Sequence, residues 1–160
     1  MRLPGVLVQG ILARAALAWL RIYLGVVFLL AAIPKLQQDF APGLTRFLEQ
    51  VALQRGHPFY REFVQQVVLP NTSVFAALVT WGELFVGVTL ILGVLTRVSA
   101  TVALLLTVNY LFAKGQWFWT PSSNDAAFAA ISIGLLIGAA GRTFGLDALL
   151  ARRWPRAPFW

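Results

Sequence analysis

Four long apolar stretches constrain the fold of this chain more than any other feature. They cover residues 15–33, 74–95, 98–113 and 126–140. A helix needs roughly 20 largely apolar residues to cross the hydrocarbon core of a bilayer; the first two stretches meet this length, and the last two are shorter. Because lipid offers the backbone no hydrogen-bonding partner, spanning segments of this kind form helices. The sequence therefore predicts an all-α fold, a four-helix bundle in the membrane that forms a single domain over residues 1–160.

Composition supports a membrane protein. Of the 160 residues, 59% are hydrophobic and 12% are charged, whereas soluble domains have roughly 45–50% apolar and about 25% charged residues. The chain has no cysteine and one histidine, His57, so thiol chemistry and a multi-histidine metal site within one chain are excluded. We expect no metal and no intrinsic cofactor. The net charge is +7, and the basic residues lie beside the apolar stretches. This placement indicates contact with the head groups of the lipid bilayer and not with nucleic acid.

Helix-end signals bound these stretches. Pro34-Lys35 is expected to stop the first helix, Asn71-Thr72-Ser73 to cap the start of the second, and Ser122-x-x-Asp125 to form a capping box before the fourth. The residues before position 15 contain one proline and two glycines, so we expect a retained interfacial segment rather than a cleaved signal peptide.

The loop over residues 35–73 is too long to lack structure in a compact protein. Residues 42–54 carry apolar side chains at helical spacing, and residues 58–69 do the same before Pro70. This pattern predicts two amphipathic helices. Two roles are open for them: to cap the bundle, or to lie on the membrane surface and bind a partner.

Arginines indicate the orientation in the membrane. Four spans place both termini and the Thr96-Arg97 link on one side, and that side carries Arg2, Arg14, Arg97, Arg142, Arg152, Arg153 and Arg156. By the positive-inside rule this side is cytoplasmic, and the loop around His57 is outside. Residues 145–160 form an amphipathic segment that we expect on the cytoplasmic surface of the inner membrane.

Two ionisable residues, Arg21 and Glu83, fall inside apolar stretches. Charges are costly in hydrocarbon, so we expect both to face the bundle interior, either opposite each other or in one shared polar cavity. A simple ion pair and a ligand or proton site both remain open. Arg21 and Lys35 share one stripe of the first helix, and Lys35 is therefore a third candidate.

Four further residues are possible contributors to the polar site. Asn109 and Tyr110 lie near the end of the third stretch, where hydrogen bonding between helices is the simpler explanation. Trp117 fits an interfacial aromatic belt, although tryptophans there could also clamp a planar head group. Asp125 is first explained as part of the capping box.

Several motifs resemble the DoxX/DoxD family of small four-helix membrane proteins. They are Arg21-Ile22-Tyr23-Leu24-Gly25 with Lys35-Leu36, Glu83-Leu84-Phe85-Val86-Gly87 through Gly93 with Thr96-Arg97, and Gly141-Arg142 through Leu146-Asp147. The resemblance implies that Arg21, Lys35 and Glu83 are shared polar residues, with Arg142 and Asp147 in a C-terminal signature. Many family members have a histidine near the end of the third span, where this chain has Lys114.

The resemblance implies a role in membrane redox systems. We expect an accessory or assembly subunit, more consistent with a non-catalytic protein than with an enzyme, that works with other membrane or peripheral redox subunits. The alternatives are a quinone-interacting subunit of a thiosulfate:quinone-type oxidoreductase and a small-solute transporter. The candidate bound molecule is a quinone or a lipid. Whether the chain forms a homo-oligomer is left open by the sequence.

Overall fold

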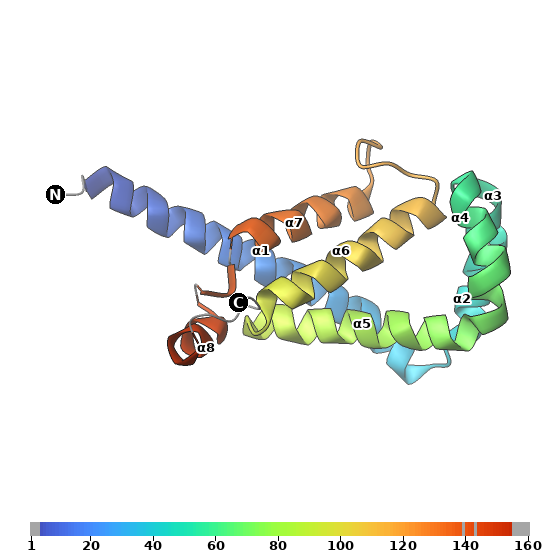
Figure 1. Cartoon of the computed structure of the whole chain (residues 1–160), viewed down its shortest axis with the longest axis horizontal. Coiled ribbons are helices and arrows are strands. Elements are labelled where there is room, and N and C mark those ends of the chain that lie inside the picture. Colours follow the sequence, from blue (N-terminus) through green and yellow to red (C-terminus); the bar gives the residue numbers. More distant parts are fainter. Residues whose placement is uncertain (1–3, 139, 143, 155–160) are drawn as a thin grey trace.

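The computed structural model describes residues 4–138, 140–142 and 144–154, and these contain helices and turns but no strand. Four long helices pack together: α1 (Pro4–Gln37), α5 (Thr72–Leu92), α6 (Thr96–Ala113) and α7 (Asn124–Gly138). Both α1 and α6 contact α5 and α7 (Figure 1). The prediction of an all-α helical bundle is confirmed.

Helix length and surface chemistry both suit a bilayer. Three helical segments are long and apolar enough to cross it, namely Gly10–Gln37, Pro58–Leu92 and Thr96–Ala113. The fifteen residues of α7 span only about 22 Å at 1.5 Å per residue. Large apolar side chains are exposed along the outside of the bundle, among them Leu30, Leu78, Trp81, Leu105 and Ile137. Lipid would remove these surfaces from water.

Two predicted helix ends are wrong. Pro34 lies inside α1, where it costs little because it is in the last turn and removes only one backbone hydrogen bond. Asn71 and Thr72 do not cap α5: their side chains donate to the carbonyl oxygens of Val67 and Leu69, at 2.9 and 2.8 Å. The chain is already helical before α5, so the first backbone N–H groups of α5 need no cap.

The long loop is a helical cap. Its first arm is α2 (Ala41–Phe47), the π-helical turn η1 (Leu48–Ala52) and α3 (Leu53–Arg55); its second is α4 (Pro58–Phe63), the π-helical turn η2 (Val64–Val68) and η3 (Leu69–Asn71). The cap lies across one end of the bundle (Figure 1). Its apolar faces form a second core with Ala76 of α5 and Ala113 of α6. The two amphipathic helices are confirmed, but Pro70 does not end the second one.

The opposite end of the bundle holds the α5–α6 link and α8 (Asp147–Arg153), close to η4 (Ala140–Arg142). The backbone N–H of Leu146 donates to the carbonyl of Leu92 at 3.2 Å, and that of Asp147 donates to Gly93 at 2.8 Å. Arg2, Arg156 and the last third of the predicted amphipathic segment lie outside the described residues.

Gly93 ends α5 in the left-handed conformation, with φ of +66°, and a Cβ there would lie 2.5 Å from Nη1 of Arg21. We expect Gly93→Ala to lower the free energy of unfolding in detergent by about 1–3 kcal/mol, because it combines an unfavourable φ with a steric clash. Gly134→Ala is the matched control: a Cβ there meets nothing within 4 Å, so the variant should be neutral or gain up to about 1 kcal/mol from helix propensity. Equal effects of the two substitutions would contradict this description of the link.

Candidate functional site

A buried carboxylate of α5 binds a cation from α1 and a hydroxyl from α6. Lys35 Nζ donates to Glu83 Oε2, and the Tyr110 hydroxyl donates to Glu83 Oε1 at 2.8 Å. The Glu83 side chain is only 4% exposed, whereas that of Lys35 is 18% exposed. A buried carboxylate needs this pairing, since a lone charge in an apolar bundle is strongly destabilising.

A second ion pair joins α6 to α7 beside this cluster. Lys114 Nζ donates to Asp125 Oδ2 at 2.6 Å. The predicted capping box is therefore wrong, because Asp125 binds a cation on the neighbouring helix. Ser123 takes the capping role: its hydroxyl oxygen accepts a hydrogen bond from the backbone N–H of Ala126 at 3.2 Å.

Two cavities meet at these charged groups. One, of about 280 Å³, lies under the cap and is lined by Lys35, Glu83, Tyr110, Lys114 and apolar cap residues. The other, of about 230 Å³, shares Glu83, Tyr110 and Lys114 and continues to Asp125, Thr107 and Phe28. Two cations, two carboxylates and a phenol thus line two neighbouring cavities, and the formal charges of these cations and carboxylates cancel.

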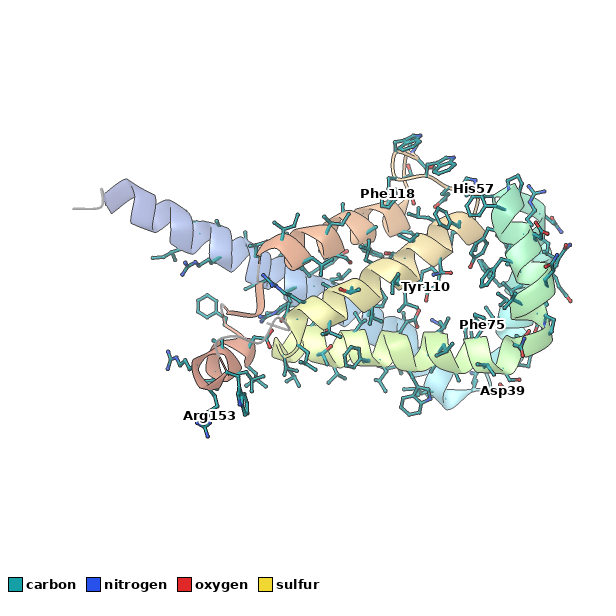
Figure 2. The ribbon with its side chains drawn as sticks, viewed as in Figure 1. Asp39, His57, Phe75, Tyr110, Phe118 and Arg153 are labelled. Atoms are coloured by element: carbon teal, nitrogen blue, oxygen red, sulfur yellow. The ribbon has the colours of Figure 1, made fainter. Side chains whose placement is uncertain are left out.

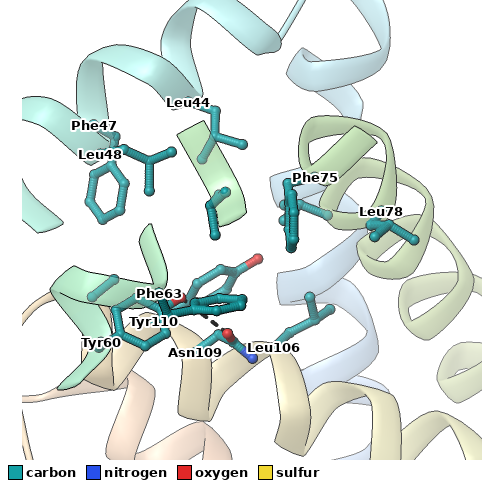
Figure 3. Close-up of a pocket in the computed structure, with 13 residues that line it drawn as sticks. Leu44, Phe47, Leu48, Tyr60, Phe63, Phe75, Leu78, Leu106, Asn109 and Tyr110 are labelled. Atoms are coloured by element: carbon teal, nitrogen blue, oxygen red, sulfur yellow. Dashed lines mark hydrogen bonds between the residues drawn. The ribbon is translucent and has the colours of Figure 1, made fainter. Parts of the chain in front are cut away.

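An apolar chamber of about 220 Å³ adjoins them between the cap, α5 and α6. Figure 3 shows aromatic side chains from three elements around it, with Tyr110 at its wall; they are Phe47, Tyr60, Phe63 and Phe75. Leu78 and Phe63 line the chamber and are also 60% and 37% exposed, so the chamber opens sideways on the outer surface of the bundle. Tyr110 lines the chamber and both polar cavities.

Arg21 does not share this site, and the expectation that it faces Glu83 is wrong. Arg21 is fully buried, but its Nη1 donates to the Ala140 carbonyl at 3.1 Å and its Nη2 to the Phe144 carbonyl at 2.9 Å. It precedes Lys35 by fourteen residues, or about 21 Å along α1 at 1.5 Å per residue. Both face the interior because fourteen residues are nearly four full turns, yet they lie at opposite ends of the bundle.

At the end of the bundle that contains Arg21, Asp147 binds the α5–α6 link. Asp147 Oδ1 accepts a hydrogen bond from the backbone N–H of Leu95 at 2.8 Å, and Asp147 Oδ2 accepts one from the backbone N–H of Thr96 at 2.9 Å. Asp147 is fully buried and occupies the N-terminal end of α6, where unpaired N–H groups favour a negative charge. This residue therefore joins the C-terminal segment to the α5–α6 link. The backbone of Arg142 ends η4, and its side chain lies outside the described residues.

Two candidates lie next to the cavities and not among the charges. Asn109 lines the apolar chamber, and its Oδ1 accepts from the Tyr60 hydroxyl at 3.1 Å. Trp117 belongs to an aromatic group outside the cavities: its ring centroid lies 4.2 Å from that of His57 and 5.6 Å from that of Trp119. Figure 2 shows His57 at the cap end of the molecule, where its Nε2 lies 3.0 Å from the Gln116 carbonyl oxygen.

Lys114 is the site residue that sequence analysis missed. It lies at the C-terminal end of α6, and its position relative to Tyr110, four residues earlier, places both on one face of the helix. That spacing was the available signal. Its partner Asp125 lies on α7, so the pairing follows only from how α6 packs on α7.

Residues 16–115 match the family model of DoxX. The chain belongs to the DoxX family. It is therefore an integral membrane protein, in agreement with its apolar helices, and no solved structure matches it. The matched region contains Arg21, Lys35, Glu83, Tyr110 and Lys114; Asp125 and the C-terminal signature around Asp147 lie beyond it.

The arrangement predicts which charges are energetically coupled. We expect Lys35→Met and Glu83→Gln each to destabilise this DoxX protein by about 3–5 kcal/mol, because each leaves a buried partner unpaired. The double variant should recover part of that loss. Arg21→Gln combined with Glu83→Gln should instead be additive, because the two groups are far apart. Thermal unfolding in detergent of the single and double variants of each pair measures the coupling energy. Strong coupling only between Arg21 and Glu83 would contradict the structure.

Proposed function

We propose that this DoxX protein is an accessory subunit of a redox system in the cell inner membrane, and that it binds a quinone between its cap and its helices. The observation that carries the proposal is Tyr110, whose side chain lines an aromatic chamber on one side and a charged cavity on the other. A quinone has the matching chemistry: an apolar ring and tail, and two polar oxygen atoms.

The residues suit both redox forms of such a ligand. The carbonyl oxygens of a quinone accept hydrogen bonds, and the ammonium groups of Lys35 and Lys114 are donors. A quinol hydroxyl is a donor, and the Glu83 carboxylate is an acceptor. The aromatic walls of the chamber favour the ring through stacking, and the three adjoining cavities together reach the roughly 300–1,000 Å³ typical of small-ligand sites. The sideways opening at Leu78 leads to where the tail would lie, in lipid.

The composition of the chain supports the accessory role. With no cysteine and one histidine, it has few of the side chains that hold an electron-carrying metal centre. The ligand would therefore exchange electrons with a partner subunit, and this chain would supply the binding site, its hydrogen bonds and its shielding from water.

Quinone binding is testable with the isolated protein. Titration of decylubiquinone should quench tryptophan fluorescence in detergent. Tyr110→Phe removes the hydroxyl that orients Glu83 at the site, and the loss of this hydrogen bond, about 0.5–1.5 kcal/mol net, should weaken binding about two- to tenfold. Tyr23→Phe is the matched control, because Tyr23 lies on the outside of α1 and stacks on Trp19. Absence of saturable quenching, or equal loss in both variants, would disprove the proposed site.

We also propose that the cap lies outside and the termini lie in the cytoplasm, since arginines gather at the terminal end. The chain has no cysteine, so a single introduced cysteine reports its own side. Glu62→Cys on the exposed cap surface should be labelled by a membrane-impermeant thiol reagent in intact cells, and Arg153→Cys on α8 only after lysis. The reverse labelling would invert the topology.

A further inference from the structure

A fourth cavity lies on the other side of Lys35 from the proposed quinone site. It measures about 270 Å³ and is bounded by the end of α1, the start of α2 and the first turns of α5. Its lining combines polar and apolar side chains, and the polar ones are Lys35, Gln38, Asp39, Ser73 and Thr80. None of the proposed ligand contacts except Lys35 belongs to it.

This cavity is open to the surface and reaches buried side chains. Gln38, Asp39, Ser73 and Trp81 of its wall are exposed, whereas Thr80 is buried. Thr80 follows the first residue of α5 by eight positions, about 12 Å along the helix. A polar space of this size can hold water, because it offers several hydrogen-bonding partners.

Lys35 is the boundary between the two spaces. Its side chain lines this cavity and also the one that contains Glu83 and Tyr110. It is 18% exposed, while its partner Glu83 is 4% exposed. Water in the outer cavity can therefore reach the ammonium group, and the ammonium group contacts the carboxylate.

We propose that the cavity at Lys35, Asp39 and Thr80 is an aqueous vestibule through which Glu83 exchanges protons with solvent. The role of this route rests on the proposed function, because a bound quinol must release protons when it is oxidised. The structural part of the proposal, a water-filled route to Lys35, stands independently of the ligand.

The proton transfer accompanies oxidation of the bound quinol, whose electrons pass to the partner redox subunit. The quinol hydroxyl gives its proton to a carboxylate oxygen of Glu83. Lys35 lines the vestibule and Glu83 does not, so the Lys35 ammonium gives a proton to vestibule water and then takes the proton of Glu83, which restores the ion pair. The charged and titratable groups around Glu83 are Lys35 from α1, Tyr110 and Lys114 from α6, and Asp125 from α7. The cap contributes only apolar side chains there.

Cysteine labelling tests the vestibule without any quinone. A thiol reacts as the thiolate, which forms readily only where water reaches it. In lipid nanodiscs, a water-soluble methanethiosulfonate should label Thr80→Cys and Ala76→Cys, both buried positions of the vestibule wall. Ser73→Cys, at an exposed position of the wall, is the positive control. Val86→Cys, fully buried on the same helix, is the negative control and should stay unlabelled.

Two results would overturn the vestibule. One is labelling at Ser73→Cys with none at Thr80→Cys and Ala76→Cys, which would show a dry cavity. The other is equal labelling at Val86→Cys, which would show that water enters the bundle without this route. Neither depends on whether decylubiquinone binds, so failure of the quinone proposal is distinguishable from failure of the vestibule.

Discussion

The pairing of buried charges determines how this bundle can be assembled. A charge left alone among apolar helices is strongly unfavourable, and each buried charge that the structure describes has partners on another element. Arg21 binds carbonyl oxygens of the segment after α7, Glu83 binds Lys35 and Tyr110, and Asp125 binds Lys114. These contacts join α1 to α5, α5 to α6 and α6 to α7, so the helices pack with only one arrangement of partners.

The two ends of the bundle use such contacts differently. At the terminal end, Arg21 and Asp147 bind backbone groups of links and leave no described cavity between them. At the cap end, charged side chains bind one another around open space. Backbone partners hold a loop in one conformation, whereas paired side chains can exchange partners with a ligand. The structure thus separates an end closed by contacts to the backbone from an end that encloses cavities.

Most residues of the polar sites, though not Lys114, could be predicted, but their partners could not. Apolar context singled out Arg21 and Glu83, and heptad spacing added Lys35 to the same stripe of α1. The cost of leaving either charge in lipid then suggested that Arg21 and Glu83 face each other. That step failed because the interior stripe of α1 is long: Arg21 lies about 21 Å from Lys35 along the helix, and Lys35 is the residue that reaches Glu83.

The sequence by itself determined the membrane environment, the all-α fold and the two helices of the cap, because hydrophobic length and helical periodicity are properties of short segments. Only the tertiary structure decided that the cap packs on the bundle end, that Asp125 pairs instead of capping α7, and that Tyr110 stands between an apolar and a charged cavity. The physical reason is that a periodic pattern fixes which face of a helix is apolar, whereas cavities and ion pairs depend on which other helix that face meets.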